Sequence, residues 1–246
     1  MAVIASVVVR NEAHRYLESC LAWNSQWWDE LFVYDDQSTD TTREICSEYT
    51  DTVVVRPDGV PSFMEHEGRY RSAAWAALVE RCNPTTGDWV FALDADEFLV
   101  GIESDVDLRT EVRCAVVGAS MDSRRSVEFR IPDVWDFDET MIRLDGFWGS
   151  IERPELIRFQ NDWSFRPKSM GCGSGPEYSF QRPWKSEQIG LLHYGHAHPE
   201  DRQERHSRYT SLPDHGHHPK HIASIISTPT LKKWTGQVPE VWRGRR

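Results

Sequence analysis

The sequence has few cysteines and no closely spaced cysteine pair. Among 246 residues there are five, Cys20, Cys46, Cys82, Cys114 and Cys172, and no C-x-x-C motif occurs. An odd number of cysteines argues against a disulfide framework, and the missing C-x-x-C argues against a cysteine-ligated zinc site. We therefore expect the thiols to be reduced, as in a cytoplasmic protein.

Long hydrophobic runs are also missing. The longest apolar stretch near the start, residues 2–9, is too short to span a bilayer and leads at once into the charged segment RNE. It has neither the basic start nor the small-residue cleavage pattern of a signal peptide. We expect a soluble, cytoplasmic protein without a membrane span.

An excess of positive charge is missing from the chain as a whole. The formal net charge is −11, which argues against a broad nucleic-acid footprint. Residues 220–246 differ, because they contain six basic residues and only one acidic residue, Glu240, which gives a local net charge of +5. The simpler interpretation is a solvated terminus. The alternative is a contact with an anionic partner, for example a nucleic-acid acceptor.

Apolar residues are plentiful, and their pattern indicates an α/β fold. Hydrophobic residues make up 39% of the chain, enough for a core in one large domain. Apolar strand-like runs at 2–9, 31–34, 52–55 and 89–93 alternate with helix-like segments at 11–28, 41–49 and 65–82. This alternation predicts a mostly parallel central sheet with helices on both faces.

The pattern changes after residue 100. A helix is predicted at 108–119, and the short segments SVEFRI, ETMIRL and PELIRF are typical of a smaller antiparallel addition. The glycine-rich segment 172–179 predicts a loop. IGLL then predicts a last strand, followed by helices in PEDRQERHSRY and HIASII.

Polar clusters follow three of the predicted parallel strands: RNE (10–12), DDQSTD (35–40) and DADE (94–97). Ligands of parallel sheets bind beyond the carboxyl ends of the strands, so the three clusters are expected at one crevice. In an extended chain Asp94 and Asp96 share a face, where their charges repel unless a cation lies between them. The acids could instead cap a following helix. If a cation does lie between them, the carboxylate oxygens of Asp94 and Asp96 suit Mg²⁺ or Mn²⁺.

The order of these motifs resembles the family 2 glycosyltransferases, whose fold is called GT-A. The resemblance rests on RNE after the first strand, YDDQSTDTT after the second, and DWVFALDADEFL, with Asp36 and Asp94 separated by 58 positions. It covers residues 2–100 well and 101–200 loosely. It implies a GT-A domain at 1–210, with a nucleotide-binding half at 1–100 and an acceptor-side half at 101–210. Residues 211–246 would form a basic extension.

The resemblance implies a set of nucleotide-binding residues. Asp36 would accept a hydrogen bond from the ring N–H of a uracil-like base, while Asp35 supports the loop. Arg10 and Asn11 would line the base or the ribose. Arg71, with Arg69 as a second candidate, would contact the nucleotide, although either arginine could instead form a surface salt bridge. Gln37 departs from the glycine that the family usually has there, which leaves the base preference open.

The resemblance also implies a metal site for Mn²⁺ or Mg²⁺. Asp94 would contact the ribose or a water-bridged metal, and Asp96 would be a direct ligand. His193, in HYGHAH at the end of the last strand, resembles the C-terminal histidine that many GT-A enzymes supply as a further ligand. An independent zinc site shared by His193, His196 and His198 is the alternative. His215, His217 and His218 are interpreted as loop residues.

The general base has no clear motif. In an inverting transfer, a carboxylate takes the proton of the acceptor hydroxyl as the oxygen attacks the anomeric carbon. Asp133 and Asp136, in PDVWDFDE, and Glu187, before the last strand, are the candidates, although each could be an ordinary surface acid. Trp135, Trp148 and Trp184 could stack on a sugar ring, but most of the eleven tryptophans must serve packing.

These observations predict a metal-dependent, inverting glycosyltransferase that moves a sugar from a nucleotide-sugar donor, UDP-linked rather than GDP- or dTDP-linked, to an unknown hydroxyl acceptor. A sugar nucleotidyltransferase would need a glycine-rich phosphate loop after the first strand, and VVVRNEAHR has no glycine. A non-catalytic carbohydrate- or partner-binding relative would be expected to lose D-x-D, which this chain retains.

Overall fold

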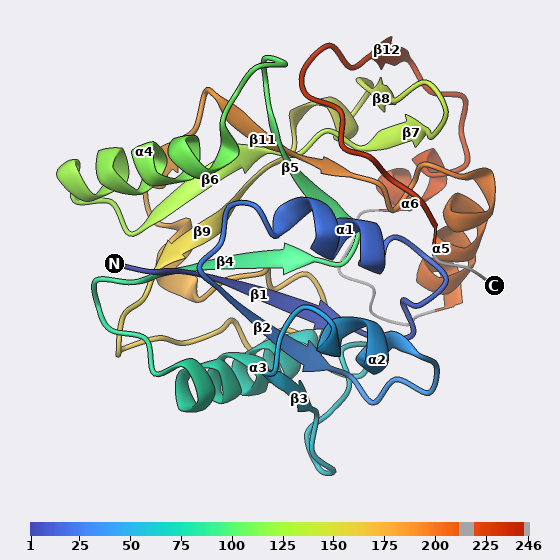
Figure 1. The fold of residues 1–246 in the computed structure, drawn as a ribbon. Coiled ribbons are helices and arrows are strands. Elements are labelled where there is room, and N and C mark those ends of the chain that lie inside the picture. Colours follow the sequence, from blue (N-terminus) through green and yellow to red (C-terminus); the bar gives the residue numbers. More distant parts are fainter. Residues whose placement is uncertain (212–218, 244–246) are drawn as a thin grey trace.

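The structure is a computed structural model that describes residues 1–211 and 219–243 (Figure 1). The predicted loop histidines His215, His217 and His218 lie outside the described residues, as do Arg245 and Arg246 of the basic terminus.

A seven-stranded sheet forms the centre of the fold, and its order is β10-β6-β9-β4-β1-β2-β3. Strands β1 to β4 are mutually parallel, whereas β9 runs antiparallel between β4 and β6. The strands are β1 (Val3–Val9), β2 (Glu30–Asp35), β3 (Val53–Val55), β4 (Trp89–Asp94), β6 (Ser126–Arg130), β9 (Glu152–Arg158) and β10 (Trp184–Lys185). The predicted α/β class with a mostly parallel central sheet is confirmed.

Helices cover both faces of this sheet (Figure 1). On β4, Trp89 and Phe91 pack in the core with α1 (Leu17–Asn24), α2 (Thr42–Ser47) and α4 (Leu108–Met121). The intervening Val90 and Ala92 pack with α3 (Glu67–Cys82) on the opposite face. This alternation is the period of two that a strand imposes on its side chains. Both faces of β4 are therefore buried, which explains its continuous apolar sequence.

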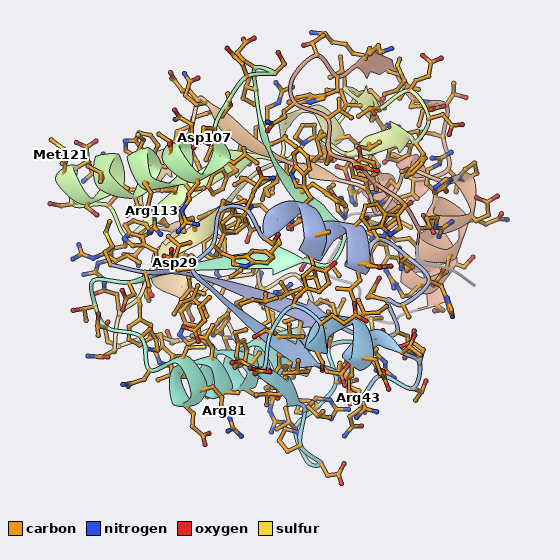
Figure 2. The ribbon with its side chains drawn as sticks, in the orientation of Figure 1. Asp29, Arg43, Arg81, Asp107, Arg113 and Met121 are labelled. Carbon is orange, nitrogen blue, oxygen red and sulfur yellow. The ribbon has the colours of Figure 1, made fainter. Side chains whose placement is uncertain are left out.

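Salt bridges hold α4 against the start of the sheet. Arg109 and Arg113 of α4 both form ion pairs with the carboxylate of Asp29, which precedes β2. Figure 2 shows Arg113 beside Asp29. The Asp29 carboxylate also accepts a hydrogen bond from the backbone N–H of Val3 at 2.8 Å. One acid thus joins the first strand, the second strand and a helix that comes much later in the chain.

Two smaller antiparallel sheets complete the fold. Strand β5 (Glu97–Gly101) pairs with β11 (Ile189–His193), and β8 (Met141–Arg143) lies between β7 (Val134–Asp136) and β12 (Leu231–Lys233). The helices of this part are η1 (Trp148–Ser150), η2 (Glu177–Phe180), α5 (Pro199–Ser211) and α6 (Pro219–Ser224). The predicted antiparallel addition is confirmed.

The DADE segment is a turn, and this corrects the extended geometry expected for it. Asp94 ends β4, Ala95 and Asp96 form the turn, and Glu97 begins β5. The Glu97 carboxylate accepts a hydrogen bond from the Asp94 N–H at 3.1 Å, which closes the turn. The acids do not begin a helix either. They lie where two buried strands meet.

The described part of the C-terminal segment packs on the domain, so the interpretation as a solvated terminus is wrong for residues 231–243. Gln237 donates its N–H to the Gly101 carbonyl at 3.0 Å, and the Trp242 carbonyl accepts from Ser19 Oγ at 3.0 Å. Arg243 pairs with Asp201 at 2.7 Å. No helix among the described residues has the length and apolarity that a membrane span requires.

Candidate active site

A cavity of about 520 Å³ opens beside the carboxyl ends of β1 and β4. Its volume is within the range of ligand sites, which is about 300–1,000 Å³. The charged residues of its lining are Arg10, Arg15, Arg71, Arg153, Arg205, Arg208, Glu12, Asp36, Glu67, Asp94, Asp96 and Asp133. Three histidines, His193, His196 and His221, also line it.

Asp36 lines the cavity and is 1% exposed. Its carboxylate accepts hydrogen bonds from Arg10 Nη1 at 3.3 Å, from the Phe63 N–H at 3.1 Å and from Arg56 Nε. A carboxylate has about four acceptor positions, so three donors leave room for one more.

Asp35 and Asn11 do not line the cavity but fix the loops beside it. Asp35 Oδ2 accepts the Ser38 N–H at 3.0 Å, and the Asn11 side chain accepts the Thr39 N–H at 2.8 Å. Asn11 has φ 53°, in the left-handed region that asparagine tolerates better than most residues.

Arg71 reaches the cavity from α3, the helix that precedes β4. Its Nε donates to Glu67 Oε1 at 2.8 Å, and its Nη2 lies 3.8 Å from Asp94 Oδ1. Burial alone would lower the pKa of Arg71, but Glu67 and Asp94 hold it above its usual value. The neighbouring candidate Arg69 is exposed and does not line the cavity.

Asp96 and His193 lie next to each other in the lining of the cavity. His193 Nε2 lies 3.4 Å from Asp96 Oδ1, and Arg205 Nη2 lies 3.5 Å from Asp96 Oδ2. Burial opposes ionisation of both groups, yet their attraction lowers the pKa of Asp96 and raises that of His193 to about 10. Asp96 is therefore a carboxylate held between two cationic groups.

Gly195 keeps the space between these groups open. A Cβ at this position would lie 2.6 Å from both Asp96 Oδ2 and His193 Nε2, and it would also collide with Arg205. A carboxylate and an imidazole nitrogen that face a gap of this kind fit a divalent cation once the cation displaces the proton on His193 Nε2, with further positions left for water and phosphate oxygens. The donor set suits Mn²⁺ or Mg²⁺.

Asp133 joins two of the histidines. Its Oδ1 lies 2.5 Å from His193 Nδ1 and 2.9 Å from His196 Nδ1, and the three residues are close enough to be a potential metal-binding group. Both distances are those of direct hydrogen bonds. His198 is not part of this group, because its ring stacks on Phe137 at 4.7 Å. The structure thus does not assemble the three-histidine zinc site.

Of the three candidate bases, only Asp133 lines the cavity. Asp136 is exposed and accepts the Glu139 N–H at 3.1 Å, and Glu187 is exposed near the opposite end of β11 from His193. Trp148 lines the cavity, whereas Trp135 stacks on His196 and Trp184 packs beside Gly118.

Several lining residues were not among the candidate site residues of the sequence analysis. Glu12, Arg15, Glu67, Arg153, Arg205 and Arg208 all line the cavity. Glu12 belongs to the RNE cluster, and burial raises its pKa to about 7. On α5, Arg202, Arg205 and Arg208 recur every three residues, which places them on one helix face. That three-residue spacing is the sequence signal from which a shared helix face for the α5 arginines could have been predicted.

Comparison with known proteins identifies the family of the chain. The sequence model of the family described as "Glycosyl transferase family 2" matches residues 4–166, which is more than half of the chain. The chain belongs to this family. The match begins in β1 and ends after β9, so it includes all three polar clusters at the strand ends.

Two uncharacterized mycobacterial proteins are related to the chain, Rv3786c of Mycobacterium tuberculosis and Mb3815c of Mycobacterium bovis. Each is 31% identical over 166 residues, which cover 64% of this chain and 33% of the relative. The chain thus spans only part of the length of these relatives.

Among solved structures, Staphylococcus aureus TarS shares the fold. One TarS structure has a TM-score of 0.53 and 16% sequence identity and covers 92% of this chain and 42% of that one. The TarS 1–349 structure has a TM-score of 0.50 and 15% identity, with 92% and 69% covered. At these identities the likeness extends to the fold alone, which is that of the GT-A glycosyltransferases.

Proposed function

We propose that this chain is the catalytic domain of a metal-dependent glycosyltransferase that moves a sugar from a UDP-sugar to a hydroxyl acceptor with inversion. The observation that carries the proposal is the convergence of Asp36, Asp94, Asp96 and His193 on one cavity. These residues come from three strand ends that are far apart in the sequence. The family to which the chain belongs supports the same reaction class.

Asp36 is proposed to bind the base of the donor. Its three protein donors fix it in position. The remaining acceptor position suits the ring N–H of uracil. Arg10, which lines the cavity and pairs with Asp36, is proposed to contact the ribose.

Asp96 and His193 are proposed to hold Mn²⁺ or Mg²⁺, with Asp94 beside them at the ribose. When bound, the cation would stabilise the negative charge that develops on the departing diphosphate. Arg71 would balance the charge of Asp94 and orient it, because its guanidinium is already held by Glu67.

Asp133 is proposed to orient His193 rather than to act as the base. It is 1% exposed and its Oδ1 is occupied by two imidazoles. Burial opposes the ionisation of Asp133, but the two histidines lower its pKa well below the usual value. A carboxylate with so low a pKa is a weak base and is unsuited to take a proton near neutral pH. A carboxylate that fixes the distant nitrogen of a metal-binding histidine is a recurrent arrangement.

The test is calorimetric titration of UDP in the presence and absence of Mn²⁺. For Asp96→Asn we expect a loss of at least about tenfold in Mn²⁺-dependent UDP affinity, because one charged ligand becomes a neutral amide. Asp51→Asn, an exposed acid outside the cavity, is the matched control and should behave as wild type. Equal Mn²⁺–UDP affinity in wild type and Asp96→Asn would reject the metal assignment.

A further inference from the structure

Glu155 is a buried acid that takes no part in the proposed function. It lies in β9 and is 1% exposed. Leu156 and Pro154 pair with consecutive residues of β6, so the register skips Glu155, which is the extra residue of a β-bulge. Bulges are common beside active sites, where they redirect a single side chain. The contacts of the Glu155 carboxylate therefore bear on its role.

Arg153 lies between Glu155 and Glu97. Its Nη2 forms an ion pair with Glu97 Oε1, and its Nε lies 2.9 Å from Glu155 Oε1. The contact with Glu155 is electrostatic, because Arg153 Nε makes no aligned hydrogen bond and Glu155 Oε2 has no hydrogen-bond partner among the described residues. Ser174 Oγ, from the glycine-rich loop, donates to Glu155 Oε1 at 3.2 Å. One guanidinium is therefore held between an acid of β9 and an acid of β5.

Through Glu97, this arginine reaches the DADE turn. Glu97 Oε2 accepts the Asp94 N–H at 3.1 Å, while Glu97 Oε1 faces Arg153. A chain of contacts thus runs from Glu155 through Arg153 and Glu97 to the backbone of the turn. Asp96, the proposed metal ligand, lies within this turn.

Stability does not explain a second acid beside Arg153. Moving charges out of water costs free energy, and the attraction within a buried ion pair often does no more than offset that cost. Glu97 alone would balance the charge of Arg153, so an ionised Glu155 leaves this group with an excess negative charge. Burial accordingly raises the pKa of Glu155 to about 7. A carboxylate that is costly to ionise is better explained by its effect on Arg153 than by a contribution to folding.

Without Glu155, the Arg153 guanidinium would be free to turn toward the proposed metal site. Its side chain is 33% exposed and lines the cavity. Burial would lower the pKa of Arg153, but nearby acids raise it. After its two close partners, Asp94 is the acid with the largest effect. A guanidinium that moved to Asp94 would neutralise charge beside the cation and compete with it.

We propose that Glu155 is a positioning residue for the DADE turn. It keeps Arg153 against the cavity wall, where the guanidinium holds Glu97 and stays away from Asp94. The proposal rests on the proposed function, because it takes the cation to bind beside this turn. The Ser174 contact joins the glycine-rich loop to the same group.

The first experiment is hydrogen exchange of the metal-free protein at pH 8, where most of Glu155 is ionised. In Glu155→Gln the amide hydrogens of the DADE turn should exchange at least about threefold faster than in wild type, because Glu97 is no longer fixed as the acceptor of the Asp94 N–H. Glu155→Asp, which keeps the charge, should lie closer to wild type. Glu152→Gln is the matched control, because Glu152 is an exposed acid of the same strand.

The second experiment titrates Mn²⁺ into the same proteins at the same pH. Glu155→Gln should bind Mn²⁺ about tenfold or more weakly than wild type and the control. Arg153→Gln removes the competing guanidinium, so adding Glu155→Gln to it should change Mn²⁺ affinity by less than about twofold. Additive losses in the double variant would mean that Glu155 acts without Arg153 and would overturn the proposal.

Urea unfolding tests the purely structural explanation. The urea midpoint of Glu155→Gln should equal or exceed that of wild type, because the remaining pair of Arg153 and Glu97 is balanced in charge. A midpoint well below that of wild type would make the weaker Mn²⁺ binding a consequence of destabilisation and would count against a positioning role.

The two assays separate failure of this proposal from failure of the proposed function. Wild type that binds no Mn²⁺, with faster exchange in Glu155→Gln, would contradict the proposed function and support the positioning of the turn. Mn²⁺ binding that needs Asp96, with exchange and affinity unchanged in Glu155→Gln, would support the function and reject the positioning role.

Discussion

Gly195 shapes the site because it has no side chain. Asp96, His193 and Arg205 converge on the position that a Cβ would fill. Gly195 does not have a positive φ, so its backbone conformation is open to alanine. The requirement for glycine here is one of space and not of conformation.

We therefore predict that Gly195→Ala weakens Mn²⁺ binding by at least about tenfold, because the added methyl group lies where the ligands face one another. The fold should persist, and circular dichroism checks this. Gly87→Ala is the control, since a Cβ there would meet its nearest neighbour at an ordinary 3.8 Å. Unchanged Mn²⁺ affinity in Gly195→Ala would place the cation elsewhere.

Individual site residues could be predicted from sequence where they follow a strand directly. Asp36, Asp94 and Asp96 end or follow buried strands, and His193 ends β11, so strand direction alone brings them to one edge. Arg205 could not be placed in this way, because the contact depends on how α5 packs against the sheet. The pairing of Asp133 with two histidines likewise depends on β7, which the sequence pattern did not reveal.

Among helices and loops, α3 and the glycine-rich loop form one unit. Glu67, in the first turn of α3, accepts the N–H groups of Gly171 at 2.5 Å and Cys172 at 3.2 Å as well as Arg71. Gly171 and Gly173 line the cavity. The Glu67 carboxylate thus holds in place the glycine-rich loop, which forms part of the cavity wall.

We predict that Glu67→Gln lowers the free energy of unfolding by about 1.5–3 kcal/mol at pH 7, because hydrogen bonds to a charged group are replaced by weaker ones. Burial raises the pKa of Glu67, but Arg71 and the loop N–H groups hold it below its usual 4.5. The stabilising contribution is therefore complete above pH 4.5 and is lost as the pH falls through the lowered pKa.

Urea unfolding of wild type and Glu67→Gln across this pH range provides the measurement. The difference between the two proteins should shrink as the solution becomes acidic. Glu48→Gln, an exposed acid, should show no such trend. A difference that is independent of pH would mean that Glu67 acts through shape and not through charge.

Secondary structure could be predicted from sequence where burial determines the pattern of apolar residues. The prediction was less accurate where hydrogen bonds between loops determine the backbone conformation. Strand β4 was predicted at 89–93 and spans Trp89–Asp94. Helix α1 was predicted from residue 11 but begins at Leu17. The reason is tertiary: Asn11 N–H donates to Ser38 Oγ at 2.9 Å and Glu12 N–H to Thr42 Oγ1 at 2.8 Å. These bonds to the DDQSTD region replace the first turns of a helix.

In the whole chain, the C-terminal segment completes the core. Trp234 is 8% exposed, packs in the main hydrophobic core and donates its indole N–H to the Gln237 carbonyl at 2.9 Å. Trp242, eight residues later, is 37% exposed. The charge pattern of this segment pointed to solvent, whereas its tryptophans determine where it lies.

We predict that Trp234→Ala lowers the free energy of unfolding by about 3–5 kcal/mol, the usual cost of removing a buried aromatic side chain. Trp242→Ala should cost less than about 1.5 kcal/mol, because its ring already contacts water. Guanidinium unfolding, with the slope compared between variants, measures both. Equal effects of the two substitutions would argue against the docked segment.

Strand β5 follows directly on the DADE turn, yet in the described chain it pairs only with β11, the strand that ends in His193. The proposed metal ligands on either side of this pairing are therefore brought together late during synthesis. When Asp96 has left the ribosome, the neighbouring strand β5, which is fully buried in the folded protein, stays unpaired until β11 emerges. We expect this interval to be the step at which chaperones matter most for the protein, and metal to bind only after it has passed.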